Sequence, residues 1–251
     1  MTRVIMHGCN GHMGKVISEL VSNDPDVVIV AGIDLNTDEN FGYPVFANIM
    51  DCDIEADAII DFSVAAAVDA LLEYSKEKNI PVVLCTTGLS EEQLTKVNEV
   101  SKDVAVLKSA NMSLGINTLM KLLKMATDVL ADRGYDIEIV EKHHNQKVDA
   151  PSGTALALAD VINETKDNRY DYVFDRSQKR EKRSENEIGI SAVRGGTIVG
   201  QHDVIYAGTD EVIEIRHTAY SKAVFAKGAI DAAKYIAGKE PGMYDMSDVI
   251  D

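Results

Sequence analysis

The chain has 251 residues and a formal net charge of −16, from 41 acidic and 25 basic side chains. Hydrophobic residues make up 45% of it, which is enough to bury a sizeable core in one large domain or two smaller ones. So negative a protein repels phosphate backbones and anionic lipids, and we therefore expect neither nucleic-acid binding nor membrane binding.

The first half of the chain alternates short apolar runs with amphipathic segments. Continuous apolar runs are typical of strands buried on both faces, and helices between such strands make right-handed crossovers, so the pattern predicts a parallel sheet. The predicted strands are Arg3–His7, Val27–Ile33, Ala58–Asp61, Pro81–Leu84 and Ala105–Leu107, and the predicted helices run from the glycine-rich turn to about Ser22, over Ala65–Lys78 and over Glu91–Ser101.

The second half has longer connections and a different order of elements. The predicted helices are Leu114–Ala131, Thr154–Glu164 and Ala223–Ala237, and the predicted strands are Tyr135–Glu141, Gly189–Val193, Thr197–Tyr206 and Glu211–Thr218. This order predicts an open mixed or antiparallel sheet in an α+β domain. The basic run Arg176–Arg183 could be a localisation or nucleic-acid patch, but the acidic charge of the whole chain favours an exposed loop.

A glycine-rich turn follows the first predicted strand. Gly8, Gly11 and Gly14 have the spacing GxxGxxG, which permits a tight turn and lets the backbone approach a pyrophosphate at the start of a helix. Asp34 stands twenty residues after Gly14, at the end of the second strand, where an acid binds the ribose hydroxyls of adenosine. We interpret the first half as a Rossmann-like dinucleotide-binding domain, although a glycine-rich turn alone can be purely structural.

Small polar residues follow two later strands, at Cys85–Gly88 and Ser109–Met112. Ligands of open α/β sheets gather at the carboxyl ends of the strands, and hydroxyl and amide groups suit a nicotinamide and its ribose. Ordinary turn chemistry is an equally open alternative, with Asn111 or Ser113 capping the next helix.

The densest cluster of chemical groups is the segment Glu141–Thr154, with the sequence EKHHNQKVDAPSGT. Its histidines and lysines crowd a predicted strand-to-helix connection, and backbone amides at the start of that helix can bind an anion. The combination predicts a site for a small carboxylate, where His143 or Lys147 supplies a proton. A solvated loop is the alternative; we expect no metal, because adjacent histidines rarely share one and no third ligand lies near.

The chain resembles the dihydrodipicolinate reductase (4-hydroxy-tetrahydrodipicolinate reductase) family from end to end. The segment His143–Ala155, HHNQKVDAPSGTA, is the most specific part of the resemblance. The other motifs are the glycine turn, DFS at Asp61–Ser63, TTG at Thr86–Gly88, SANMSLGIN at Ser109–Asn117, VRGGTIVGQH at Val193–His202 and GMYDMSDVI at Gly242–Ile250. The chain departs from the family pattern at Cys85, where Gly is usual, at Gln201, where Glu is usual, and after DFS, where proline is common.

The resemblance implies an oxidoreductase that reduces 4-hydroxy-tetrahydrodipicolinate with NAD(P)H in diaminopimelate and lysine synthesis. It implies a nucleotide-binding domain over residues 1–108 with 222–251, and a substrate-binding domain over 109–221 whose sheets build a homotetramer. His143 would be the acid/base residue and Lys147 the proton donor, with a small cyclic dicarboxylate held by His144, Gly153 and Thr154. The dinucleotide would be held by Gly8, Cys9, Asn10, Gly11, His12, Met13, Asp34, Cys85, Thr86, Thr87, Ser109, Ala110, Asn111 and Met112.

The residues after Asp34 bear on the choice of cofactor. The stretch Leu35–Asn40 contains no Lys or Arg to accept a 2′-phosphate, and Asp38 and Glu39 add to the negative field. We therefore expect NADH to be preferred, with NADP(H) still possible.

Two other functions fit the same pattern: another NAD-dependent reductase of a small carboxylic acid, and a non-catalytic dinucleotide sensor. A sensor would not need His143, Lys147 and the helix amides together. Three cysteines without paired spacing argue against a disulfide framework or a zinc site. The start MTRVIMHG leaves no room for a signal peptide, so we expect a cytoplasmic protein.

Overall fold

The computed structural model describes residues 1–37 and 42–250 and divides the chain into two compact units. The first unit is Met1–Leu114 with Ala223–Asp251, and the second is Gly115–Lys222. The first unit thus includes the residues that follow β6 (Ala105–Leu107) up to Leu114, and Met112 among them is buried in its hydrophobic core.

A seven-stranded sheet forms the centre of the first unit, and all its strand pairs are parallel. Its order is β12-β6-β5-β4-β1-β2-β3, so the chain builds outward from β1 first on one side and then on the other. The carboxyl ends of β1 and β4 thus lie at a switch point, where open α/β sheets bind ligands. The strands are β1 (Thr2–His7), β2 (Val27–Ile33), β3 (Val45–Phe46), β4 (Ala58–Asp61), β5 (Val82–Leu84), β6 (Ala105–Leu107) and β12 (Gly242–Tyr244).

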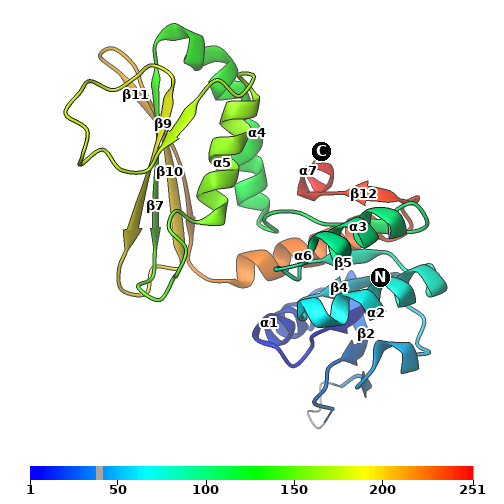
Figure 1. Cartoon of the computed structure of the whole chain (residues 1–251). Helices are drawn as coiled ribbons and strands as arrows, with labels where there is room; N and C mark the ends of the chain where they lie inside the picture. Colours follow the sequence, from blue (N-terminus) through cyan, green and yellow to red (C-terminus); the bar gives the residue numbers. More distant parts are fainter. Residues whose placement is uncertain (38–41, 251) are drawn as a thin grey trace. The chain divides into compact units, whose positions relative to one another are not determined.

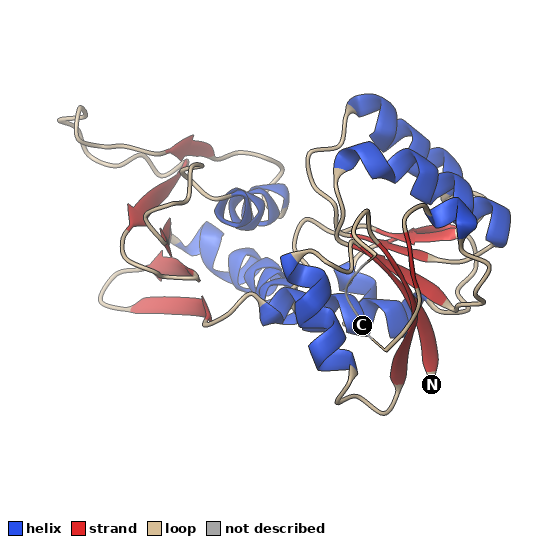
Figure 2. Cartoon of the chain, turned by 90° about the horizontal axis from the view of Figure 1, so that it is seen from below, coloured by secondary structure: helices blue, strands red, loops and turns tan. Residues whose placement is uncertain are grey.

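Helices cover both faces of this sheet (Figure 2). The helices α1 (His12–Val21) and α6 (Ala223–Ile236) pack on one face, and α2 (Ala65–Lys78) and α3 (Glu91–Val100) pack on the other. Fully buried alanines along α6 let that helix approach the strands closely. A short helix, α7 (Met246–Val249), ends the unit. The Rossmann-like parallel sheet that the sequence predicts is confirmed.

The second unit is a five-stranded mixed sheet of order β11-β10-β7-β9-β8, with helices on one face (Figure 1). The strand β10 runs antiparallel to β7 and β11, whereas β9 runs parallel to β7 and β8. The predicted α+β architecture is therefore confirmed. The elements are α4 (Leu114–Leu130), β7 (Asp136–His143), α5 (Gly153–Glu164), β8 (Asp171–Val173), β9 (Glu187–Arg194), β10 (Gly200–Ala207) and β11 (Val212–Ala219).

Two local differences from the sequence expectations affect the site. The strand β7 continues to His143 instead of ending at Glu141, so the histidine is held in a sheet rather than in a loop. The basic run Arg176–Arg183 lies in the connection between β8 and β9 and is mostly exposed, as expected of a loop. No helix in the described ranges is long and apolar enough to cross a membrane.

Candidate active site

The glycine turn of the first unit is built for close backbone approach. Gly8 has φ +83°, and a Cβ there would lie 2.5 Å from the carbonyl oxygen of Phe62, so only glycine fits. Gly11 is the N-cap of α1 and offers no side chain to cap the helix. The first amides of α1 therefore face a ligand site with the positive end of the helix dipole behind them, which suits a pyrophosphate.

Asp34 lies beside this turn, as the sequence predicts. Its Oδ2 accepts a hydrogen bond from the backbone N–H of Asn10 at 3.0 Å, and its Oδ1 accepts one from Asn36 at 3.3 Å. A pocket of about 540 Å³ opens here, with a largely apolar wall that suits an adenosine. It is lined by His7, Gly8, Gly11, Ile33, Asp34, Leu35, Ala47, Phe62, Ser63, Val64, Ala66 and Ala67.

A buried polar pair at the switch point escaped the sequence analysis. His7 Nδ1 lies 2.8 Å from Asp61 Oδ1, and the Ser63 hydroxyl donates to the same oxygen at 2.6 Å. His7 and Asp61 are paired residues at the ends of neighbouring strands, and His7 lines the pocket. The signal in the sequence was a histidine that directly follows the apolar residues Val4–Met6 at the end of the strand.

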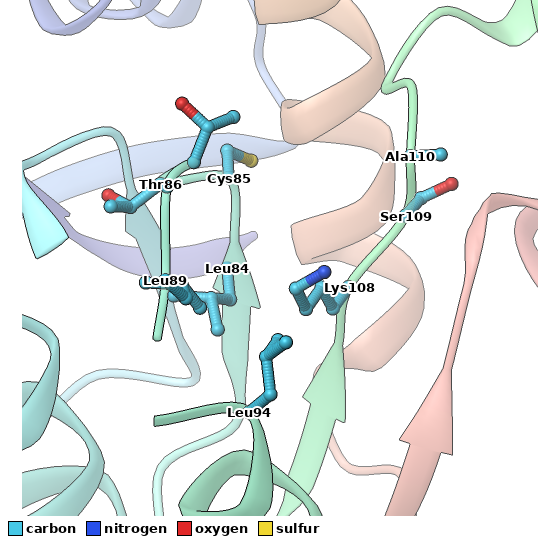
Figure 3. Close-up of a pocket in the computed structure, with 10 residues that line it drawn as sticks. Leu84, Cys85, Thr86, Leu89, Leu94, Lys108, Ser109 and Ala110 are labelled. Atoms are coloured by element: carbon cyan, nitrogen blue, oxygen red, sulfur yellow. The ribbon is translucent and has the colours of Figure 1, made fainter. Parts of the chain in front are cut away.

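The later strand ends form a second pocket of about 270 Å³ (Figure 3). Cys85, Thr86 and Thr87 from the end of β5 meet Ser109 and Ala110 from the end of β6 there. Leucine side chains gather at its base, and the side chain of Lys108 extends between the two strand ends (Figure 3). Burial, with a smaller contribution from the negative charge of Asp61, raises the pKa of the Cys85 thiol, which makes it a neutral lining group rather than a nucleophile.

Three of the predicted cofactor residues have mainly structural surroundings. The Cys9 side chain is fully buried in the core, and its amide bonds to the carbonyl of Ile33 at 3.3 Å. Met112 is also buried in that core. Asn111 accepts a hydrogen bond from the Ser113 amide at 2.8 Å, which is the turn role that the sequence left open.

In the second unit, β7 ends in a buried carboxylate–imidazole pair. Glu141 is fully buried, and its Oε2 lies 2.6 Å from His143 Nδ1. Arg194, at the end of β9, bonds both carboxylate oxygens at 2.7 Å, and the Ser152 amide donates to Oε1 at 2.9 Å. Burial raises the pKa of Glu141, but the hydrogen bonds from Arg194, His143 and Ser152 outweigh it and hold the pKa below the ordinary value.

The segment after β7 brings the other predicted substrate residues together. His144 and Lys147 are half-buried, and Lys147 Nζ pairs with Asp149 Oδ1 at 2.8 Å; this hydrogen bond lowers the pKa of Asp149. Gly153 and Thr154 are the first two residues of α5. They lie at the N-terminus of the helix, where the helix dipole is positive. An ammonium group and a helix N-terminus on one segment can bind a carboxylate.

His202, on β10, contacts two residues of the segment Glu141–Thr154. Its Nε2 lies 3.0 Å from the Ser152 hydroxyl, and its ring meets that of His143 edge-on with centroids 5.2 Å apart. Burial, helped by the neighbouring His143, lowers the pKa of His202 to about 4, so it is neutral at pH 7. Across the residues that the structure describes, no group of three or more His, Cys, Asp or Glu side chains is placed to hold a metal ion.

Taken together, these features define a two-unit oxidoreductase that uses a pyridine dinucleotide: one unit has the glycine turn and its acidic neighbour, and the other has the imidazole, the ammonium and the helix N-terminus. The chain belongs to the dihydrodipicolinate reductase family, whose N-terminal model matches residues 2–112 and whose C-terminal model matches residues 115–250.

Several relatives match this chain over its whole length. It is 55% identical to the 4-hydroxy-tetrahydrodipicolinate reductase of Clostridium novyi (strain NT), over 100% of this chain and 98% of that protein. It is 53% identical to the enzyme of the same name from Caldanaerobacter subterraneus subsp. tengcongensis, with the same coverage. The dipicolinate-bound dihydrodipicolinate reductase from Paenisporosarcina sp. TG-14 has a similar fold, with a TM-score of 0.82 at 24% identity, over 98% of this chain and 97% of that one.

Proposed function

We propose that this protein reduces 4-hydroxy-tetrahydrodipicolinate to tetrahydrodipicolinate, with NAD(P)H as the hydride donor, in diaminopimelate and lysine synthesis. The observation that carries the proposal is the match along the whole chain to curated reductases of that name, at 48–55% identity. The segment His143–Thr154 supports it, because its groups suit a small dicarboxylate that must be protonated during reduction.

In this proposal His143 is the acid/base residue and Lys147 the proton donor, while His144, Gly153 and Thr154 hold the dicarboxylate. A bound nicotinamide supplies the hydride. The 4-hydroxyl group of the substrate would leave as water, which gives the cyclic unsaturated dicarboxylate that accepts the hydride. Hydride addition would build negative charge on the conjugated ring next to its nitrogen, and a nearby ammonium or imidazolium would stabilise that charge and deliver the proton. The N-terminus of α5 holds a substrate carboxylate without adding a further titratable group.

The dinucleotide is proposed to lie along the switch-point edge of the first unit. The glycine turn and Asp34 would hold the pyrophosphate and the adenosine ribose, and the pocket at Cys85–Thr87 and Ser109–Ala110 would accept the nicotinamide half. The remaining predicted contacts are Asn10, His12, Met13 and, through their backbones, Cys9, Asn111 and Met112.

NADH is the proposed preferred cofactor, and NADPH remains usable. The carboxylate of Asp34 lies beside the proposed ribose position, and the neighbouring Leu35 is exposed and uncharged. A 2′-phosphate there would meet a negative charge without a basic partner from residues 35–40. The acidic residues Asp38 and Glu39, which the prediction also invokes, lie outside the described residues.

We also propose a homotetramer in the cytoplasm, built through the sheets of the second unit. The support is the edge strand β11, which exposes Val212 and Ile213, and the exposed Val193 on β9. Apolar side chains on an open sheet are typical of a surface that another subunit covers. Light scattering after size-exclusion chromatography tests the assembly, since a monomer would contradict it.

The function is tested by mixing the protein with NADH and enzymatically generated substrate and following the nicotinamide absorbance band. Oxidation of NADH that depends on this substrate is the expected result. Oxidation only with other small acids would indicate a different reductase, and binding of NADH without oxidation would indicate a sensor. Either outcome would overturn the proposed function.

A further inference from the structure

Glu141 is an acidic residue at a fully buried position of β7. Ile137, Ile139, Glu141 and His143 alternate along β7 and all point to the buried face of the sheet. A carboxylate on the core face is unfavourable unless its charge is paired and its oxygens are fully hydrogen-bonded. An apolar residue here would continue the pattern of the strand, but it would leave the guanidinium of Arg194 without its partner.

The surroundings of Glu141 supply that pairing from three elements. Arg194 of β9 contributes a two-pronged guanidinium contact, Ser152 before α5 contributes a backbone N–H, and His143 of β7 itself contributes Nδ1. Four donors therefore fill the two carboxylate oxygens. His202 of β10 is a further titratable group here, and it contacts the Ser152 hydroxyl and the His143 ring rather than the carboxylate.

This arrangement decides where His143 carries its proton. An ionised carboxylate only accepts hydrogen bonds, so the 2.6 Å contact to Oε2 requires a proton on Nδ1. No hydrogen bond joins Nε2 to any residue that the structure describes; this nitrogen faces Gly200, where a Cβ would lie 3.1 Å away. Nε2 is thus the nitrogen of His143 that can exchange a proton with a ligand.

We propose that Glu141 is the positioning residue of the reaction: it fixes His143 with its proton on Nδ1 and Nε2 turned to the substrate, and it anchors the Ser152 amide at the start of α5. The part that concerns His143 rests on the proposed function. One buried carboxylate thereby links the acid/base group to the helix end that holds the substrate carboxylate. Arg194 balances the charge of Glu141, and the carboxylate in turn fixes the orientation of the His143 ring.

The first test measures the tautomer in the unaltered protein. Nitrogen NMR of ¹⁵N-histidine-labelled protein at pH 8, with the His143 signals assigned by their loss in His143→Gln, should show a protonated Nδ1 and a bare Nε2. A proton on Nε2 instead would overturn the proposal. This measurement needs neither substrate nor turnover, so it stays decisive even if the proposed reaction fails.

The second test uses Glu141→Gln and Glu141→Asp. With Arg194 bound to the amide oxygen, the NH₂ group of a glutamine would face His143 and favour the proton on Nε2. We expect kcat to fall by about 10²- to 10⁴-fold in Glu141→Gln, the range found when a catalytic histidine loses its orienting carboxylate or a positioned acid/base is lost. Affinity for NADH should be unchanged, and Glu141→Asp should recover part of kcat because it keeps a carboxylate.

Glu138→Gln is the matched control, because Glu138 is on the same strand and pairs with Arg183 at 2.9 Å without contacting His143. It should keep its kcat and the tautomer of His143. If Glu141→Gln lowers thermal stability but keeps the wild-type kcat and pH profile, Glu141 is only a structural ion-pair residue and the proposal is wrong. If the variant does not fold, the wild-type tautomer still decides.

Discussion

Replacing Lys147 with methionine removes an amine and leaves the apolar stem in place. In the structure, Nζ of Lys147 contacts Asp149 at 2.8 Å, and the two side chains are 23% and 55% exposed. Such an ion pair contributes about 0–1 kcal/mol to folding. Loss of a positioned proton donor, in contrast, lowers kcat by about 10²- to 10⁴-fold, or about 3–5 kcal/mol of barrier. The expected effect on catalysis is therefore several times larger than the expected effect on stability.

The assay follows NADH oxidation with saturating substrate, and thermal unfolding is measured on the same preparations. Affinity for NADH should not change, since the glycine turn belongs to the other unit. Lys166→Met is the matched control: Lys166 is in the same unit and pairs with Asp132 at 2.7 Å, but it lies outside the segment Glu141–Thr154. Wild-type turnover in Lys147→Met, or an equal loss in both variants, would refute the role of Lys147.

Four further predictions concern binding and stability. Thr154→Val should raise KM for the dicarboxylate by roughly 10- to 150-fold, because a charge-assisted hydrogen bond contributes about 1.5–3 kcal/mol; an unchanged KM would make the start of α5 a structural turn only. Leu35→Arg should raise kcat/KM for NADPH at least roughly tenfold at moderate ionic strength, by giving the 2′-phosphate a cation, and no gain would show that the ribose pocket lies elsewhere. Gly8→Ala should weaken NADH binding strongly in titrations, whereas Gly238→Ala, with φ +77° but nothing within 4 Å of its Cβ, should bind NADH nearly normally; equal effects would mean that backbone strain, not the close approach, matters. The neutral His202, with a pKa of about 4 against an ordinary 6.5, stabilises the fold above pH 6.5, and about 3 kcal/mol should be lost as the pH falls to 4. Denaturant unfolding of His202→Gln should show a correspondingly smaller loss over that range, and an identical loss would contradict the burial argument.

The architecture of the first unit was readable from the sequence because its strands are buried on both faces. Val27–Ile33 and Ala58–Asp61 are continuous apolar runs, and the structure has strands over the same residues. The edge strand Gly242–Tyr244 was not predicted, since three residues carry no periodicity and Met243 is exposed. Its place beside Ala105–Leu107 depends on a pairing between distant parts of the chain.

The candidate site was readable only in part. The sequence singles out His143 and Lys147 as candidates. It places Arg194 in the motif VRGGTIVGQH, far along the chain, but does not indicate which residue Arg194 contacts. That contact arises from the parallel register of β7 and β9, which sets His143 opposite Arg194. Secondary-structure propensity and residue spacing within one segment contain no information about how two distant strands pair. The ion pair between Glu141 and Arg194 can therefore be recognised only once the register of β7 and β9 is known.

A single strand, β7, thus contributes residues both to the hydrophobic core and to the candidate site. Ile137 and Ile139 fill the core under the helices, and the next two inward positions of β7 are Glu141 and His143. The low dielectric that makes a carboxylate costly there also strengthens each hydrogen bond that it accepts. His202 is neutral at pH 7 and therefore adds no positive charge beside His143. Burial therefore fixes the orientation of His143 more firmly than an exposed loop could, and in the proposed reaction the strand, not the loop that follows it, would set the position from which His143 transfers a proton.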